Sequence, residues 1–191
     1  MRVRLLVYFF ICLSALNLST ARAASIWLDP AVVTASPGDT ISFYLTVDFS
    51  SDPTLGGGID IFYDSSLLSY HSFDFGSATV VIDPAFSRLP NVMTNKLEGL
   101  AFGDFSGISA GAIGTLTFQA LVTGNTTLGL ADTTDTLVGG FYSAGSYGQQ
   151  FPVYTGSSVR ISSVPVPGAF WLFGSGMIGL LAMGWARHGL A

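Results

Sequence analysis

The chain has 191 residues, a length that suits one domain with some additional sequence. Hydrophobic residues make up 49% of it and charged residues 10%, against about 25% charged in an average protein, which excludes an intrinsically disordered chain. Residues 24–163 contain three basic and twelve acidic side chains, a net charge of −9. This charge excludes nucleic-acid binding, because no basic patch offsets the repulsion of phosphates.

Residues 1–24 have the parts of a secretory signal peptide. A basic start precedes an apolar run over residues 5–16, which is too short to span about 30 Å of hydrocarbon. Ala21 and Ala23 fit the narrow pockets of signal peptidase, and we expect cleavage after residue 23 or 24. The only cysteine, Cys12, lies in this run, so the mature protein would contain no disulfide, thiol nucleophile or zinc–thiolate site.

Short stretches of alternating apolar and polar residues follow, with turn residues between them and no long helical period. The clearest is residues 41–48, which a Pro37-Gly38 pair opens with the pattern of a type II turn. About nine or ten such stretches predict an all-β sandwich of jelly-roll or Ig-like kind. The expected strands are residues 26–34, 41–48, 59–63, 70–75, 79–82, 97–103, 115–120, 126–131, 136–142 and 158–162.

The order of these motifs resembles the cohesin domain over residues 26–162. The matching segments are Pro37-Gly38-Asp39-Thr40, residues 58–64, residues 111–118, residues 124–128 and Val159-Arg160-Ile161. The resemblance implies a cohesin-like sandwich of about nine strands over residues 25–163. It also implies a type of ligand. Cohesins bind dockerins, which are calcium-loaded modules on partner proteins. Cohesins share their fold with cellulose-binding modules, and residues 69–107 diverge most from the pattern.

The sequence between residues 24 and 163 contains no strong catalytic motif. His71 is the only histidine between residues 24 and 163, and no Gly-x-Ser-x-Gly motif accompanies it, so we interpret it as an exposed strand residue. Asp60 and Asp64 lie on one strand face, and glycosidases use two carboxylates of this kind. A glycosidase pair must also lie in a cleft, which the spacing of two residues in the sequence does not show. We interpret them as an outward strand residue and a turn cap, and we expect no catalytic residue and no enzyme activity.

Acidic loops suggest one alternative, a calcium site. Asp48, Asp52, Asp132 and Asp135 could provide carboxylate ligands together with backbone carbonyls. No Asp-x-Asp-x-Asp-Gly loop is present, and Asp132 and Asp135 also fit a hairpin end. The sequence therefore predicts no cofactor and no metal site, with calcium as the alternative.

Aromatic residues gather in residues 141–154. Tyr142, Tyr147, Phe151 and Tyr154 could form a surface on which sugar rings stack, with nearby glutamines as hydrogen-bonding groups. The alternative is a hairpin whose aromatic side chains pack against the edge of the sandwich, because glycine and serine between aromatics are also typical of β-turns.

Residues 169–185 contain no charge and, as a helix of about 26 Å, are just long enough to span a membrane. Arg187 follows on the side that the positive-inside tendency makes cytoplasmic, which places the body outside. The alternative is a short buried helix. Together with Val164, Pro165, Val166 and Pro167, this segment resembles the PEP-CTERM sorting signal of Gram-negative bacteria over residues 164–191. The resemblance implies processing by an exosortase near the Val-Pro-x-Pro motif.

The sequence as a whole predicts an exported, surface-sorted, non-enzymatic binding or structural protein of the cell envelope or extracellular matrix. Its expected partners are signal peptidase, exosortase, the inner membrane during sorting, and an envelope protein bound by the cohesin-like module. The expected route is a single-pass membrane intermediate followed by the cell surface or the exterior. The alternative function is a carbohydrate-binding module that acts on extracellular polysaccharide.

Overall fold

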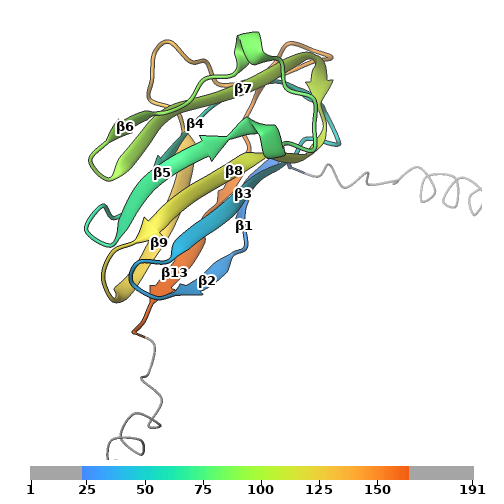
Figure 1. The fold of residues 1–191 in the computed structure, drawn as a ribbon. Helices are drawn as coiled ribbons and strands as arrows, with labels where there is room; N and C mark the ends of the chain where they lie inside the picture. Colours follow the sequence, from blue (N-terminus) through green and yellow to red (C-terminus); the bar gives the residue numbers. More distant parts are fainter. Residues whose placement is uncertain (1–22, 164–191) are drawn as a thin grey trace, which may run out of the picture.

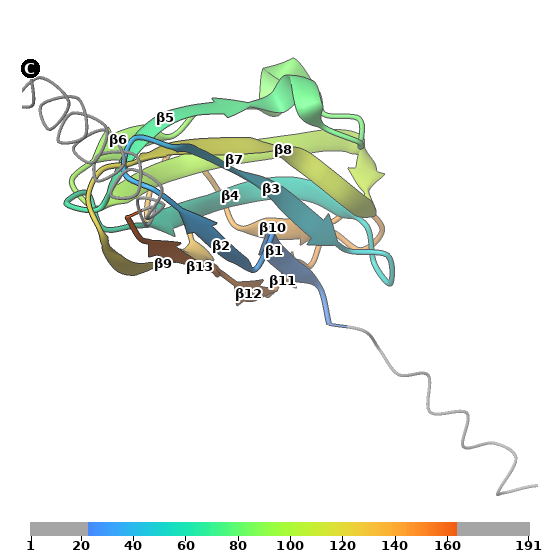
Figure 2. The same cartoon turned by 60° about the horizontal axis from the view of Figure 1, so that its bottom comes forward.

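A computed structural model describes residues 23–163, which form two β-sheets packed face to face around a common core (Figures 1 and 2). The five-stranded sheet has the order β12, β1, β3, β8, β5. Its strands are β12 (Val153–Thr155), β1 (Ser25–Asp29), β3 (Thr40–Asp48), β8 (Ala110–Ala120) and β5 (Leu68–Asp74). Neighbours in this sheet are antiparallel except β1 and β12, which run parallel.

The eight-stranded sheet is centred on β4, which has neighbours on both sides. β7 pairs with one side of β4, while β10 and β9 pair with successive parts of the other side. The strands are β11 (Gln149–Gln150), β10 (Phe141–Ser143), β4 (Thr54–Phe62), β9 (Gly124–Asp132), β13 (Ser157–Ile161), β2 (Val32–Ala35), β7 (Lys96–Ile108) and β6 (Asn91–Met93). Two short 3₁₀ helices, η1 (Phe75–Ser77) and η2 (Pro84–Phe86), lie between β5 and β6.

The core consists of the inward-facing residues of both sheets. On β3 the alternation predicted from the sequence is confirmed, because Ile41 is 4% exposed and Phe43, Leu45 and Val47 are fully buried. Ile59 and Ile61 of β4 and Leu116 and Phe118 of β8 are fully buried in the same way. The type II turn that opens β3 is also present: Gly38 has a φ of +94°, and Asp39 donates its N–H to the Ser36 carbonyl at 3.0 Å.

The number of strands is larger than expected, thirteen within residues 23–163 instead of nine or ten. The additional strands are two to four residues long, too short for an alternating pattern to reveal. The expected strand over residues 26–34 divides after Asp29, because Pro30 has no N–H to continue the ladder. Its first part pairs with β3, and its second part, β2, pairs with β13 in the other sheet.

The strand predicted over residues 79–82 is wrong. Thr79 donates its N–H to Ala112 of the five-stranded sheet at 2.9 Å, and Asp83 donates to Gly103 of the eight-stranded sheet, also at 2.9 Å. The segment therefore crosses from one sheet to the other and forms no ladder with either. Of the strand predicted over residues 136–142, only the end belongs to a strand, β10.

The predicted leader and sorting signal lie almost wholly outside the described residues. Among residues 23–163 there is no helix of the length and apolar character needed to cross a membrane. The described chain begins beside β1 and ends after β13, and these two points lie at opposite ends of the sandwich (Figure 1).

Candidate functional site

A buried carboxylate on the outer face of the eight-stranded sheet is the most constrained polar group in the described chain. Asp60 lies between Ile59 and Ile61, whose side chains enter the core, so its own side chain points away from the core. It is nevertheless fully buried. Residues 133–140, which connect β9 to β10 and are called the covering loop below, fold over it and contact it directly.

Gly99, Thr133 and Thr134 donate four hydrogen bonds to the Asp60 carboxylate. Oδ1 accepts from the Gly99 N–H and the Thr133 hydroxyl, both at 2.9 Å. Oδ2 accepts from the Thr134 hydroxyl at 2.8 Å and the Thr134 N–H at 3.1 Å. Burial alone raises the pKa of Asp60, but the bonds from Gly99, Thr134 and Thr133 together outweigh it and hold the pKa below its ordinary value.

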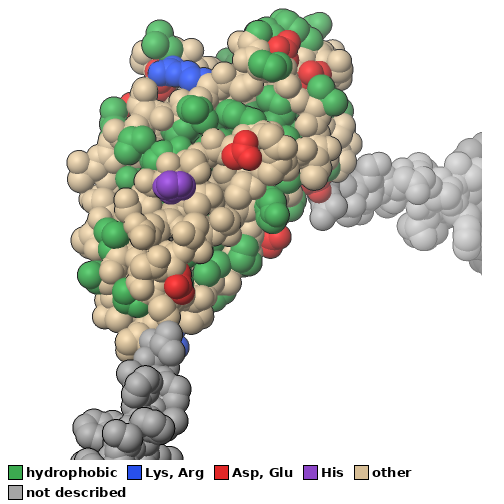
Figure 3. Space-filling view, viewed as in Figure 1, with side chains coloured by type: hydrophobic (Ala, Val, Ile, Leu, Met, Phe, Trp, Pro, Cys, Tyr) green, Lys and Arg blue, Asp and Glu red, His purple; other side chains and the backbone are tan. Residues whose placement is uncertain are grey.

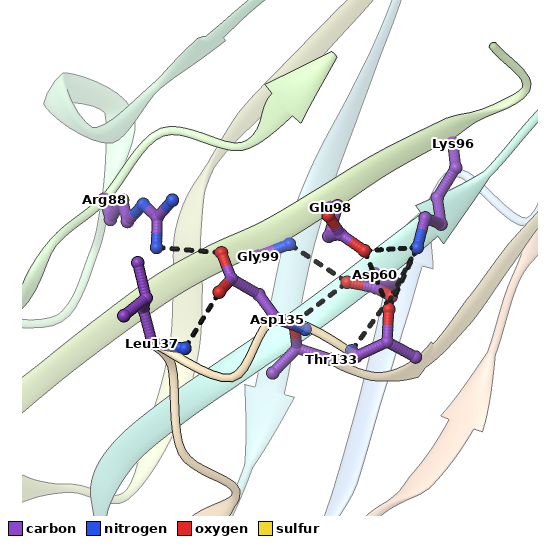
Figure 4. Close-up of polar contacts among 9 residues, drawn as sticks. Asp60, Arg88, Lys96, Glu98, Gly99, Thr133, Asp135 and Leu137 are labelled. Atoms are coloured by element: carbon purple, nitrogen blue, oxygen red, sulfur yellow. Dashed lines mark hydrogen bonds and ion pairs between the residues drawn. The ribbon is translucent and has the colours of Figure 1, made fainter. Parts of the chain in front are cut away.

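Two charged side chains of β7 complete this network (Figure 4). The Lys96 Nζ lies 3.4 Å from Asp60 Oδ2 and 2.5 Å from Glu98 Oε1. The hydrogen bond between Lys96 and Glu98 is the main reason why the pKa of Lys96 is raised and that of Glu98 is lowered. The Thr134 hydroxyl also lies 2.8 Å from Glu98 Oε1, so the start of the covering loop contacts both β4 and β7.

A second carboxylate fixes the middle of the covering loop. Asp135 forms an ion pair with Arg88, with Oδ2 at 2.8 Å from Nη1, and its Oδ1 accepts the Leu137 N–H at 2.9 Å. Arg88 is itself held by a backbone bridge to Ala101 of β7. Gly99 passes beneath this pair with a φ of +72°, and an added Cβ would lie 2.8 Å from Asp135 Oδ2. These contacts make the covering loop a fixed wall above the sheet (Figure 4).

A groove of about 390 Å³ lies between the covering loop and the segment that contains η2. Its floor includes the backbone of Gly56 and Gly57 on β4. Leu137, which is 83% exposed, stands on one wall, and Phe86, which is 43% exposed, stands on the other. The remaining lining residues are Leu55, Ala85, Ser87, Arg88, Ala101, Phe102, Gly103, Val138, Gly139, Gly140 and Tyr142.

The chemistry of this groove suits binding. Its lining contains no histidine, cysteine or carboxylate, and its only charged member, Arg88, is already paired with Asp135. Residues 23–163 also hold no group of three His, Cys, Asp or Glu residues that could bind a metal ion. A fixed groove with exposed apolar side chains on its walls can take up apolar side chains of a ligand.

The four aromatic residues singled out in the sequence lie in different places. Tyr142, 42% exposed, borders the groove, whereas Tyr147 and Phe151, 73% and 72% exposed, stand in the turns before and after β11. Tyr154 is half-buried on β12, and its hydroxyl donates to Asp132 Oδ1 at 2.5 Å. Burial first, and then this bond, raise the pKa of Tyr154. Within residues 23–163 no ring contact joins any two of the four, and sugar binding by them stays a prediction.

The other sequence candidates lie apart from the groove lining. His71 is exposed on β5, as interpreted from the sequence. Asp64 accepts the N–H and the hydroxyl of Ser66 at 2.9 and 2.6 Å, which is the turn cap that its position indicated. Asp52 accepts the Ser143 hydroxyl at 2.6 Å. Among the residues that build the site, Asp60 and Asp135 were considered in the sequence for other roles, whereas Arg88 and Lys96 carried no motif.

Comparison with known proteins identifies the fold. No family model and no curated protein sequence matches the chain. A non-cellulosomal cohesin from Archaeoglobus fulgidus aligns with a TM-score of 0.56 at 14% identity, over 74% of this chain and 93% of that one. The sixth cohesin of scaffoldin B from Acetivibrio cellulolyticus, solved with a dockerin, aligns with a TM-score of 0.60 at 18% identity, over 74% and 100%.

A type I cohesin–dockerin complex from Clostridium thermocellum gives a similar result, with a TM-score of 0.58 at 17% identity over 74% of this chain and 100% of that one. The described chain is therefore an all-β sandwich with a cohesin-like fold, in agreement with the resemblance noted in the sequence.

Proposed function

We propose that this cohesin-like sandwich is a non-enzymatic module that binds another protein through the groove beside the covering loop. Two of the similar structures are cohesins in complex with dockerins, so this fold serves protein recognition in those proteins. The observation that carries the proposal is the groove itself, in which Leu137 and Phe86 are exposed on walls held in place by Asp60 and Asp135. Because the walls are held in advance, little entropy is lost when a partner binds.

The partner of this groove is expected to insert apolar side chains and to carry basic residues around them. Residues 24–163 have a net charge of −9, and opposite charges speed association and exclude acidic partners. In the groove itself the charged lining residue, Arg88, is neutralised by Asp135, so the contact there is apolar. The basic residues of the partner would match the net negative charge of the module as a whole.

A photo-crosslinking experiment tests the groove. The photoreactive residue p-benzoylphenylalanine replaces Leu137 in the full-length protein, expressed in its own host, and a second strain carries it at Val32. Both positions are exposed, 83% and 67%, but Val32 lies on β2 at the other edge of the sheet. We expect one discrete crosslinked protein band from position 137 and none from position 32.

The proposal fails if position 137 gives no band, or if both positions give the same bands, since the second result marks non-specific proximity. Changing Asp135 to alanine in the position 137 strain provides a further control. Without its ion pair to Arg88 the covering loop is less fixed, and the yield of the crosslinked band should fall.

The same proposal includes export and sorting to the cell surface. Residues 1–24 would direct the chain to signal peptidase at Ala21 and Ala23, and residues 164–191 would hold it in the inner membrane until an exosortase acts near Val164-Pro165-Val166-Pro167. The module over residues 25–163 would then reach the cell surface or the extracellular matrix. The support for this part is the sequence of the two ends.

Mass spectrometry of the mature protein tests the sorting proposal. We expect an N-terminus at residue 24 or 25 and a C-terminus close to the Val-Pro-Val-Pro motif in protein recovered from the cell surface or medium. A variant with Pro165→Ala and Pro167→Ala should accumulate uncleaved in the inner membrane, because the segment loses the fixed extended shape that a protease cleft binds. Normal release of this variant would contradict the assignment of the motif.

A further inference from the structure

The outer face of the five-stranded sheet has an unusual composition for an exposed sheet surface. Ile26 and Leu28 of β1 point into the core, so Trp27 and Asp29 point outward, and on β3 the outward residues include Tyr44 and Thr46. Serine and threonine occupy about half of the remaining outward positions on β3, β8 and β5, and the others include His71, Gln119 and Asp74. We call this surface the polar face. In Figure 3, with β5, β8 and β3 toward the reader, most of it is uncharged.

Charge divides the two sheets sharply. All three basic residues of the described chain belong to the other sheet or its margin: Lys96 lies on β7, Arg160 lies on β13, and Arg88 bridges to β7. Within residues 23–163 the polar face has no lysine or arginine; it carries one histidine, His71, and its acidic residues include Asp29 and Asp74 (Figure 3). Most protein surfaces mix both signs of charge. With histidine counted as neutral at pH 7, the charges on this face are all negative, and they repel a polyanion.

Two aromatic side chains stand next to each other on the polar face. Trp27 is paired with Thr46, and Asp29 is paired with Tyr44, so Trp27 and Tyr44 are diagonal neighbours on adjacent strands. Diagonal neighbours lie about 7 to 8 Å apart, close enough for one polysaccharide chain to contact both rings. Tyr44 is 52% exposed and Trp27 is partly exposed.

Hydrogen-bonding groups surround the two rings in a regular pattern. The register places Asp29, Tyr44, Thr115 and Asp74 in one row across four strands. Hydroxyls both donate and accept hydrogen bonds, and a carboxylate accepts strong bonds from hydroxyl donors. This row and Trp27 beside it therefore place two aromatic rings among hydroxyl and carboxylate groups.

We propose that the polar face binds an uncharged polysaccharide, with sugar rings stacked on Trp27 and Tyr44 and sugar hydroxyls bonded to Asp29, Thr46 and Thr115. Sugars combine an apolar ring face with many hydroxyls, and this surface offers a partner for each. The lack of lysine and arginine argues against acidic polysaccharides. A protein partner is disfavoured for another reason: protein interfaces are built on a contiguous apolar centre. The exposed apolar groups of the polar face are these two rings and Val153 at its β12 edge, with many hydroxyl groups around them.

The inference adds a second ligand to the proposed function and does not depend on the groove. The two binding surfaces lie on opposite sheets, so a protein in the groove and a polysaccharide on the polar face would not compete. Such a protein would attach its partner to the polysaccharide of the surface or matrix.

Affinity electrophoresis and calorimetry test the polar face, using the full-length protein in matched detergent. The uncharged probes are dextran, laminarin, hydroxyethylcellulose and galactomannan; alginate is the anionic probe and chitosan the cationic one. We expect binding to at least one uncharged polymer, no binding to alginate, and about a tenfold loss of affinity in Tyr44→Ala. Tyr44→Phe should retain most of the affinity, because the ring is kept.

Matched variants keep the test decisive. Phe62→Ala removes an aromatic residue of similar exposure, 42%, from the other sheet and should bind as the unchanged protein does. Trp27→Ala should weaken binding as Tyr44→Ala does. The proposal is overturned by a lack of binding to every uncharged probe, by binding to chitosan alone, or by affinity that survives in the Trp27→Ala, Tyr44→Ala double variant. Loss in Tyr147→Ala with retention in Tyr44→Ala would also overturn it, by assigning the sugar to the β10–β11 turn.

Discussion

Replacing Asp60 with alanine should lower the free energy of unfolding by about 3 kcal/mol, although the residue lies outside the hydrophobic core. The substitution leaves the buried Gly99 N–H without its acceptor, removes the acceptor of the Thr134 N–H, and removes the carboxylate that faces Lys96. It also releases the start of the covering loop from β4. Urea unfolding of the full-length protein in matched detergent, followed by tryptophan fluorescence, measures the change.

Asp64→Ala is the matched control for this variant. The exposed Asp64 carboxylate accepts its hydrogen bonds from Ser66 within its own turn, so its loss should change the free energy of unfolding much less than the loss of Asp60 does. Equal effects of the two substitutions would show that the buried network contributes nothing beyond an ordinary turn.

The dependence on pH follows from the lowered pKa of Asp60. A carboxyl group whose folded pKa is below its unfolded value, about 3.9, contributes stability that is fully present above pH 3.9. This stability is lost as the pH falls through the folded pKa. The difference in stability between the unchanged protein and Asp60→Asn should therefore be constant near neutral pH and shrink below about pH 4. A difference that grows on acidification would contradict the described hydrogen bonds.

Replacing Gly56 with alanine should cost about 3 to 4 kcal/mol and alter the floor of the groove. Gly56 has a φ of +120°, which residues with a side chain rarely adopt, and an added Cβ would lie 2.2 Å from the Phe102 carbonyl oxygen on β7. The obstacle is backbone, which cannot rotate away, so β4 and β7 would have to separate where they form the floor. Urea unfolding and the crosslinking yield from position 137 should both report this change.

Gly129→Ala provides the comparison on the neighbouring strand. The atom nearest to an added Cβ there is Phe62 Cβ at 3.7 Å, an ordinary contact. We expect a change in the free energy of unfolding of no more than about 1 kcal/mol. If Gly56→Ala is tolerated equally well, the close approach of β4 and β7 is not needed for the fold.

The alternating strands could be predicted from the sequence because their signal is local. On β3 the side chains that enter the core are separated by one residue, and the same holds for Leu116 and Phe118 on β8. Val80 and Ile82 show the same alternation, yet their segment crosses between the sheets. An alternating pattern indicates which side chains face the core. It does not indicate whether a neighbouring strand is present to form the backbone hydrogen bonds of a sheet.

The candidate site could not be predicted in the same way, because it depends on contacts far apart in the chain. Asp60 and Thr134 are separated by 74 residues, and nothing near Asp60 in the sequence indicates that a loop covers it. The three consecutive glycines Gly56, Gly57 and Gly58 did indicate one part of the site. Glycines within a strand mark close approach of another backbone, and here they form the floor beneath the covering loop.

The position of the chain end relative to the groove has a mechanical consequence. Ile161, at the end of β13, pairs with Gly124 at the start of β9, whereas Asp132 at the far end of β9 pairs with Ile59, and Gly56 lies farther on along β4. The nine residues of β9 span about 30 Å. A molecule tethered through residues 164–191 would thus use its own sandwich as a rigid spacer, which lifts the groove clear of lipid headgroups. Cleavage of the chain near residue 164 would release the module and leave the groove, at the other end of the sandwich, unchanged.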